Sequence, residues 1–485
     1  MPADERAAYG QVSVATWKET AMTDTTPASG ADLTGLTAMP ALEIARAVRE
    51  GKVSPVQVVQ AHLAQIDRLE PQIRAFQVVL AEQALAEAHV LAARPGLAGL
   101  PLAGVPVAVK DNVDVAGAPT RHGSAATPAG AAQADDELVQ RLRAAGCVVI
   151  GKTQMPELAI WPFTEPQAYP VTRNPWDTDR TPGGSTGGGA AALASGMAAL
   201  ALGSDGGGSI RIPAACCGVV GLKPGPGVVP LAGGMDSHWY GLTAFGPLAR
   251  TVGDIAAALD VLTQTAAHAT PTLPDRPLRI AYSAAAAAFG ARLAPSTRAA
   301  VEDTAAALRG AGHQLVRTRP PIPANLGLKF MPRWLAGIAQ DAADLPTEAL
   351  EERTAKMARR GQRIARKVRP ASADPFVARA ARWISGFDAL IMPTMARSAV
   401  PIGIWADKGW FPTALSVGNW LCTMPWNLAG LPAISVPAPA SGPPVGVQIV
   451  APAGGENVIL SIAAELERLR PWPQLAPLAV APGHR

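Results

Sequence analysis

Two serines set among glycines are the residues of this chain best suited to chemistry. Ser185 lies in the run GGSTGGG at 183–189, and Ser209 ends the run DGGGS at 205–209. Glycines lack Cβ atoms, so consecutive backbone N–H groups can approach an anion closely. We expect an oxyanion hole here, with donors from the loop residues Gly206, Gly207 and Gly208. A serine hydroxyl beside such donors is typical of acyl transfer.

An upstream lysine can supply the base that this chemistry needs. The run Val105 to Lys110 is apolar and is bounded by Gly104 and Asp111, which predicts a buried strand that delivers Lys110 to a site. Lysine accepts a proton only when it is neutral, and burial lowers its pKa from the ordinary value of about 10.4. Because lysine has one nitrogen on a long stem, a second hydroxyl can relay protons between it and a nucleophile. A lone lysine before aspartate is usually a surface residue, and the downstream serines are what favour a catalytic role.

These motifs resemble the amidase signature family of serine hydrolases. The chain has GVPVAVKDN at 104–112, the glycine-rich stretch at 183–224, and the flanking motifs GKTQMPELA, NPWD and GVQIV. The resemblance implies that Ser209 is the nucleophile, Ser185 the bridging serine and Lys110 the base. It also implies a cis peptide bond before Ser185, which Gly184 would ease sterically. The resemblance also implies that most of the chain, from about Leu33 onward, forms one large α/β domain.

Three positions depart from the family pattern. Thr186 replaces the second serine of a common Ser-Ser pair, and Gly206 replaces the usual Thr or Ile, which admits a bulkier group beside the loop. The A-type subunits of amidotransferases generally read S-I-R-Q-P, whereas this chain has Ile212 before the proline. The last difference argues against glutamine-dependent transamidation.

Charged residues bracket the second serine. Asp205 and Arg211 could contact substrate, but we favour a buried pair that holds the glycine loop in shape. The seven histidines are scattered and lack the spacing of bases or metal ligands, so we expect no metal and no cofactor.

One motif points elsewhere. The residues GGSTG at 183–187 match the G-x-S-x-G nucleophile elbow of α/β-hydrolases, which would make Ser185 the nucleophile. That elbow follows a strong strand, whereas NPWDTDRTPGG before Ser185 is full of turn formers. We therefore keep Ser209 as the expected nucleophile.

The surrounding pattern predicts an α/β fold with a central mixed, twisted β-sheet covered by helices on both faces. A first helix begins near Pro40, and Ser54 with Pro55 predicts the start of a second that runs to about Leu69. Further elements are expected as strands at 105–110, 147–150, 278–282, 314–317, 389–392, 433–436 and 445–450, and as helices at 135–145, 190–199 and 297–311.

We divide the chain into an extension at 1–33, expected to be disordered, and one domain at 34–485 with a helical peripheral segment around 330–385. Met22 is an alternative start to Met1. The part from Glu351 to Arg369 carries eight Lys or Arg residues, and we interpret it as a solvated helix face rather than a nucleic-acid or membrane surface. Its apolar stripe would face the protein.

Aromatic residues are candidates for a substrate pocket. Tryptophans cluster between 383 and 426, and such clusters form either core or an apolar pocket. The expected pocket residues are Met155, Trp161, Trp239, Trp410 and Trp426.

Composition excludes several classes of protein. Hydrophobic residues make up 48% and charged residues 16%, and the formal charge of +4 is too small to indicate a polyanionic partner. No apolar run is long enough for a membrane span. Four cysteines without CxxC spacing fit reduced thiols, so we expect a cytoplasmic protein. We further expect a monomer or homodimer that has no nucleic-acid or membrane partner.

The sequence thus predicts an amidase that cleaves a C–N bond of a small to medium apolar or aryl amide, with anilides and carbamates (urethanes) included. Two alternatives stay open: a glutamine-dependent amidotransferase component of the A type that works with partner chains, and a non-catalytic interaction protein on the same fold.

Overall fold

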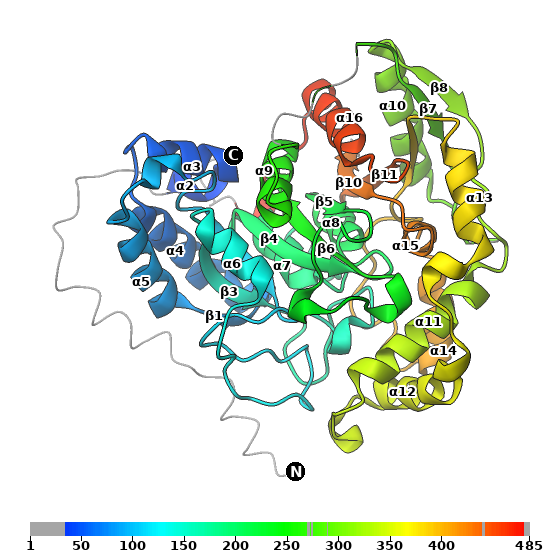
Figure 1. The fold of residues 1–485 in the computed structure, drawn as a ribbon, viewed down its shortest axis with the longest axis horizontal. Helices are drawn as coiled ribbons and strands as arrows, with labels where there is room; N and C mark the ends of the chain where they lie inside the picture. Colours follow the sequence, from blue (N-terminus) through cyan, green and yellow to red (C-terminus); the bar gives the residue numbers. More distant parts are fainter. Residues whose placement is uncertain (1–33, 269–271, 273–274, 289, 439–441, 480–485) are drawn as a thin grey trace.

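A computed structural model of the chain describes residues 34–268, 272, 275–288, 290–438 and 442–479. The expectation for the extension at 1–33 falls outside these residues. Eleven strands form one sheet in the order β1-β3-β2-β4-β6-β5-β10-β11-β9-β7-β8 (Figure 1). Their bounds are β1 Phe76–Val79, β2 Pro106–Lys110, β3 Val148–Thr153, β4 Leu200–Asp205, β5 Val220–Lys223, β6 Ala244–Ala249, β7 Arg279–Tyr282, β8 Gln314–Arg317, β9 Ala389–Pro393, β10 Ala433–Ala438 and β11 Val445–Val450.

The sheet is mixed, which confirms the predicted fold class. β2 pairs in parallel with β3 and β4, and β7 pairs in parallel with β8 and β9, whereas the other neighbours are antiparallel. Val107 and Val109 of β2 pack into one hydrophobic cluster and Ala108 into another, as the two-residue period of a strand requires. Both faces of this strand are therefore buried.

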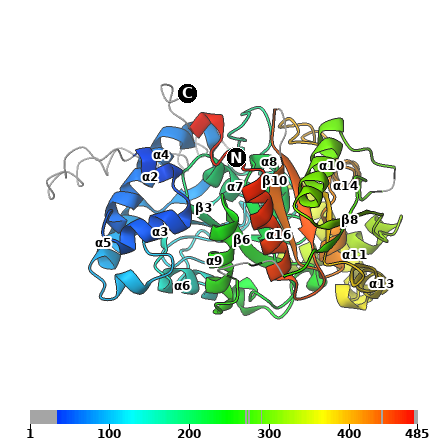
Figure 2. The same ribbon diagram turned by 90° about the horizontal axis from the view of Figure 1, so that it is seen from above.

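Helices cover both faces of the sheet. In Figure 2 α9, α16 and α10 form a row on one face, and α4, α5, α7 and α8 share the cluster that contains Ala108. The helices are α2 Thr34–Ala38, α3 Ala41–Arg49, α4 Pro55–Ile73, α5 Ala81–Ala92, α6 Glu137–Ala144, α7 Gly187–Ala194, α8 Arg211–Cys217, α9 Val252–Thr263, α10 Pro295–Gly310, α11 Leu326–Asp341, α12 Glu352–Ile364, α13 Pro375–Ile384, α14 Trp410–Gly418, α15 Met424–Leu428 and α16 Glu456–Leu469. No helix among the described residues is long and apolar enough to cross a bilayer.

Local signals explain where several elements begin and end. The Ser54 side chain accepts from Gln57 N–H and the Gln57 side chain accepts from Ser54 N–H, which is a capping box at the start of α4. The helix runs to Ile73, four residues beyond the expected end. The strands β1, β4, β5 and β6 were not predicted, because their short segments contain Gly, Ala or Pro or lack a clear alternation of β-branched residues.

The segment 330–385 is only partly peripheral. It contains most of α11 and all of α12 and α13, which lie at one side of the sheet (Figure 1). Met357 and Gly361 of α12 are buried against α11, while Arg359 and Arg360 are exposed, as predicted for a solvated basic face. Helix α11, in contrast, reaches the cavity described below.

Candidate active site

The order of the strands brings the two predicted catalytic segments to one edge of the sheet. β2 ends at Lys110 and β4 ends at Asp205, and the two strands are parallel neighbours with Val109 opposite Leu202. Parallel neighbours place their carboxyl ends at the same edge, which is where ligand sites form in open α/β sheets. Lys110 therefore lies next to the loop that leads from β4 to Ser209.

Lys110 is completely buried, and the hydrogen-bond partners of its Nζ in the described ranges are neutral oxygens. It donates to Ser185 Oγ at 2.7 Å, to Ser204 Oγ at 2.8 Å and, at 3.4 Å, to the Ser204 carbonyl. Among the described residues no carboxylate forms an ion pair with it. Burial lowers the pKa of Lys110 to about 7, although the charge of Asp205 opposes this shift. A lysine in this state can release and accept a proton near neutral pH.

Ser185 follows a cis peptide bond from Gly184, as the family resemblance implies. A Cβ at Gly184 would lie 2.7 Å from the backbone nitrogen of Phe163, so the chain passes too close there for any side chain. Ser185 is fully buried just before α7, whereas Ser209 retains 9% exposure. Ser209 is therefore the serine that small molecules can reach.

The loops of the two serines meet through their backbones. Thr186 N–H donates to the Ser209 carbonyl at 3.1 Å, but in the described chain no hydrogen bond joins the Ser185 and Ser209 hydroxyls. The first hydrogen bond of the predicted proton path, from Lys110 to Ser185, is therefore present. The second, between Ser185 and Ser209, is absent from the described residues. Catalytic hydrogen bonds are often long in enzymes without substrate and tighten when substrate binds.

The glycine loop before Ser209 is held in a conformation that only glycine adopts easily. Gly208 has φ +131°, and a Cβ there would lie 2.1 Å from Thr423 Oγ1. Its N–H donates to Asp205 Oδ1 at 2.7 Å, so Gly208 is not available as an oxyanion donor, contrary to our expectation. The N–H groups of Gly206, Gly207 and Ser209 take no acceptor among the described residues.

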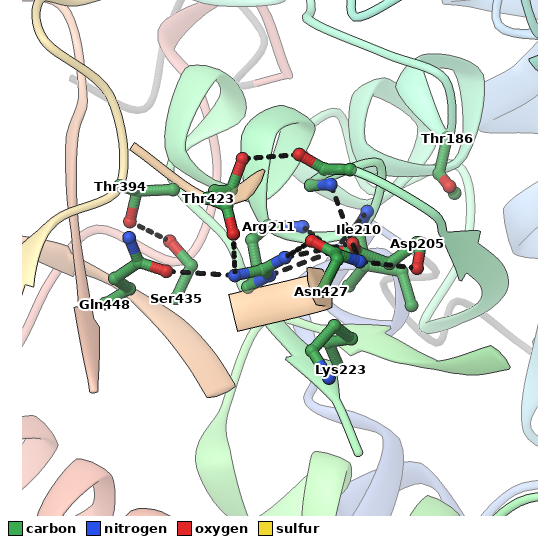
Figure 3. A network of polar contacts seen from close by, with 12 residues as sticks. Thr186, Asp205, Ile210, Arg211, Lys223, Thr394, Thr423, Asn427, Ser435 and Gln448 are labelled. Carbon is green, nitrogen blue, oxygen red and sulfur yellow. Dashed lines mark hydrogen bonds and ion pairs between the residues drawn. The ribbon is translucent and has the colours of Figure 1, made fainter. Parts of the chain in front are cut away.

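Asp205 and Arg211 form the buried pair that we expected. Arg211 Nε lies 3.0 Å from Asp205 Oδ2, and both side chains are completely buried. Asn427 of α15 and Gln448 of β11 also bind this pair, at 2.8 Å to Asp205 Oδ1 and 3.0 Å to Arg211 (Figure 3). Burial alone would raise the pKa of Asp205, but Arg211, Asn427 and Lys223 outweigh it and hold the pKa at about 2. The pair is a fixed anchor for the loop.

A cavity of about 360 Å³ opens at Ser209 and Gly207. Its walls are almost entirely apolar and come from the loop at 159–162, Trp239, α11 and α14. Trp161 and Trp239 line it, as predicted. The additional large side chains in its walls are Ile212, Leu326, Phe330, Met331, Trp334, Leu415, Leu421 and Met424.

Three predicted pocket residues lie elsewhere. Met155 lines a neighbouring cavity of about 480 Å³ that has several polar side chains in its wall. Trp410 begins α14 at the surface and packs on Phe411, and Trp426 is buried in the core with its Nε1 donating to Met392 Sδ at 3.2 Å. The prediction that these three residues line the Ser209 pocket is wrong. For Trp410 and Trp426 the reason is that clustering in sequence does not determine which side of a helix faces a cavity.

Sequence reasoning missed Ser204 and undervalued Asn112. Ser204 Oγ accepts from both Lys110 Nζ and Asn112 Nδ2, the latter at 3.1 Å, and so fixes the end of the lysine. Ser204 lies in β4, which was not predicted, and Asn112 was visible only as the end of the motif with Lys110. The aromatic residues of α11 were likewise hidden in a segment expected to be peripheral.

A second buried lysine lies on the adjacent strand. Lys152 of β3 pairs with Asp111 at 2.9 Å, and both side chains are buried. It also donates to the Pro119 carbonyl and to Thr120 Oγ1. Burial lowers the pKa of Lys152, and Asp111 counteracts this shift. Over the described ranges no group of three His, Cys, Asp or Glu residues could hold a metal ion.

Comparisons with known proteins agree with this architecture. A protein of Mycobacterium tuberculosis named "Putative amidase AmiB2" is 40% identical over 455 residues, which cover 89% of this chain and 96% of that protein. The solved structure of a 6-aminohexanoate cyclic dimer hydrolase is 31% identical with a TM-score of 0.80, over 93% of this chain and 100% of that one.

A third similarity bears on the alternative function. The A-type component of the glutamyl-tRNA(Gln) amidotransferase from Thermotoga maritima is 28% identical with a TM-score of 0.71, over 93% of this chain and 98% of that one. Residues 57–460 match the model of the Amidase family. With this match and relatives above 30% identity across most of its length, the chain belongs to the amidase signature family.

Proposed function

We propose that this protein hydrolyses the C–N bond of small to medium apolar or aryl amides through an acyl-enzyme on Ser209. The observation that carries the proposal is the contact of a buried lysine without a carboxylate partner, Lys110, with Ser185 at 2.7 Å. Its pKa of about 7 makes the neutral amine accessible at physiological pH.

In the proposed first half-reaction, Ser209 Oγ attacks the amide carbonyl. The Ser209 proton passes to Ser185 Oγ, whose own proton passes to neutral Lys110. The carbonyl oxygen gains a negative charge, which the N–H groups of Gly206, Gly207 and Ser209 can stabilise. The C–N bond then breaks, and the protons return through Ser185 to the leaving amine. Water repeats the sequence on the ester, which releases the acid and restores Ser209.

The cavity supports an apolar acyl group. The acyl part stays bonded to Ser209 after the amine leaves, so the space around Ser209 must hold it. That space has tryptophan, phenylalanine and methionine walls and no charged side chain among its described lining residues. Carbamates enter by the same chemistry, because their carbonyl is attacked in the same way.

The amidotransferase alternative is not favoured. Its motif difference, Ile212, lies in the wall of the apolar cavity. The similarity to the amidotransferase component is also lower than that to the amidase-named relative, at 28% against 40%. A non-catalytic role is not favoured either, because the Lys110 and Ser185 contact is intact.

Covalent labelling with a fluorophosphonate, followed by peptide mass spectrometry, tests the nucleophile. We expect the label on Ser209, no label in Ser209→Ala, and turnover of anilides, aliphatic amides, dipeptide amides or aryl carbamates that disappears in the same variant. Ser195→Ala is the matched control, because the partners of the Ser195 hydroxyl among the described residues are two carbonyls of α7. Normal turnover in Ser209→Ala, with labelling lost in Ser185→Ala, would instead support a nucleophile elbow at Ser185. Glutaminase activity that needs a partner chain would support the amidotransferase.

A further inference from the structure

Trp239 lies against the loop that carries Ser209, in an unusual backbone conformation. Trp239 and Tyr240 have φ of +49° and +56°, a region that ordinary side chains rarely adopt. The Trp239 side chain is nevertheless 4% exposed and lines the Ser209 cavity. Backbone strain of this kind persists only where surrounding contacts hold it, and it concentrates at functional sites.

Two glycines form the slot that holds the indole. A Cβ at Gly206 would lie 2.7 Å from Trp239 Cε3, and a Cβ at Gly337 of α11 would lie 2.4 Å from Trp239 Cδ1. Any other residue at either position would displace the ring.

Hydrogen bonds fix the ring in this slot. Trp239 Nε1 donates to Asp341 Oδ2 at 2.7 Å, and the other oxygen of Asp341 contacts His238 Nε2 at 2.9 Å. His238 stacks on Trp239 with ring centroids 5.5 Å apart, and its Nδ1 contacts Thr243 Oγ1 at 2.8 Å. The indole is therefore held at its faces and at its polar edge.

Two cavities of opposite character approach the fixed ring. The Ser209 cavity is apolar, whereas the neighbouring cavity of about 480 Å³ contains Asp114, His122, His238 and Asp341 in its wall. Trp239 lines the first, its hydrogen-bond partner Asp341 and the stacked His238 line the second, and Ala159 lines both. Leu158 and Ala159 on this partition also have positive φ, at +48° and +58°.

We propose that Trp239 is a specificity-determining residue that closes the acyl site toward the acidic cavity. This rests on the proposed acyl-enzyme at Ser209. The wall limits the length of the acyl chain and keeps a terminal ammonium away from Asp341 and Asp114, so the protein selects acyl groups that are apolar to their end. Without the indole, the two spaces join, and a long chain with a terminal ammonium gains a carboxylate partner.

A pair of p-nitroanilides tests this, with an octanoyl or an 8-aminooctanoyl group on the same leaving amine. We expect the wild type to prefer the octanoyl substrate in kcat/KM, because a buried ammonium needs a partner. Trp239→Ala should reduce that preference about tenfold or more, mainly through KM, and Trp239→Phe should reduce it about threefold. The phenylalanine variant keeps most of the ring and serves if the alanine variant does not fold.

Trp334→Ala is the matched control. It removes an indole from the same cavity on α11, and Trp334 does not line the acidic cavity. It should lower kcat/KM for both substrates and leave their ratio unchanged. A ratio unchanged in both Trp239 variants, or one that shifts equally in Trp334→Ala, would overturn the proposal.

A readout without turnover separates this proposal from the proposed function. Fluorophosphonates with an octyl or an 8-aminooctyl chain should label Ser209 with the same preference and the same change in the Trp239 variants. Labelling of Ser209 without hydrolysis of any amide would contradict the amidase function alone, and the labelling ratio would still decide the role of the wall.

Discussion

Two lysines on neighbouring parallel strands have opposite surroundings. Lys110 and Lys152 are both completely buried, and Lys152 pairs with Val109, the residue before Lys110, in the sheet. Lys152 has a carboxylate partner, Asp111, at 2.9 Å, whereas the hydrogen-bond partners of Lys110 within the described residues are hydroxyl and carbonyl oxygens. Burial disfavours the charged form of each, but of the two only Lys152 contacts a counter-ion in the part of the chain that the structure describes.

This difference separates a structural cation from a candidate base. The carboxylate of Asp111 favours the charged form of Lys152 and holds its ammonium in place. Hydroxyl partners can accept a hydrogen bond from the ammonium and can donate one to the neutral amine. Burial by itself therefore does not identify the reactive lysine. Lys110 differs from Lys152 by its missing carboxylate, and from the equally buried Lys223, which donates to the Pro224 carbonyl, by its contact with two serine hydroxyls.

Replacing each lysine by methionine, which keeps a long unbranched side chain, tests most directly whether the two lysines differ in role. Lys110→Met should lower kcat about 10³- to 10⁴-fold, because it removes the proposed base. Its free energy of unfolding should equal or exceed that of the wild type, since an uncompensated buried amine is lost. Steady-state kinetics and urea unfolding measure both. A folded Lys110→Met enzyme with normal kcat would remove this residue from the mechanism.

The companion variant should show the reverse pattern. Lys152→Met leaves the carboxylate of Asp111 buried without a cation, and we expect a loss of about 3–5 kcal/mol in the free energy of unfolding. Adding Asp111→Asn should recover most of it, because the second change removes the unpaired charge. Urea unfolding of the two single variants and the double variant gives the coupling. If the changes in the free energy of unfolding of the two single variants simply add in the double variant, the Lys152–Asp111 pair is not the cause of the loss.

The pH dependence of kcat/KM tests whether Lys110 is the base. With a pKa of about 7 for Lys110, kcat/KM should rise with pH, reach half its plateau near 7, and fall about 100-fold by two pH units below. A profile that is flat from acidic to neutral pH would argue against a lysine base.

Stability gives an independent check of the same group. The folded pKa of Lys110 lies below its unfolded value of about 10.4, so the unfolded chain binds more protons between these values and the free energy of unfolding should rise with pH there. Lys223, whose pKa burial also lowers to about 7, acts in the same direction. Lys110→Met should reduce the slope of the free energy of unfolding against pH by an amount that corresponds to at most one bound proton. Urea unfolding at several pH values in this range measures that slope. An unchanged slope would mean that Lys110 is protonated in the folded protein.

The smallest effect concerns the hydroxyl that fixes Lys110. Ser204→Ala removes an acceptor from the lysine, which should disfavour its charged form, shift the pH profile of kcat/KM to lower pH and lower the plateau within about tenfold. Ser195→Ala, in a hydroxyl outside this network, should leave the profile in place. A profile that moves in both variants, or in neither, would show that Ser204 does not tune the lysine.

Much of the scaffold followed from local signals. The capping box at Ser54, the apolar run ending at Lys110 and the alternation of strands and helices all correspond to observed elements. Predictions failed where a residue's role depends on distant partners. Gly208 N–H is taken by Asp205, and Trp426 lies in the core instead of the Ser209 cavity. Neither outcome is visible in a linear pattern.

The sequence by itself determined the chemical inventory: two glycine-flanked serines, a lysine at the end of an apolar strand, and motifs that identify the family. The tertiary structure alone decided which buried lysine contacts serine hydroxyls and which tryptophans line the cavity at Ser209. Lys110 contacts Ser185 and Ser204 across 75 and 94 positions, and the indole of Trp239 fills a slot between glycines from β4's loop and α11. The physical reason is that pKa and pocket shape depend on which groups surround a side chain in space, and the order of strands in the sheet sets those neighbours.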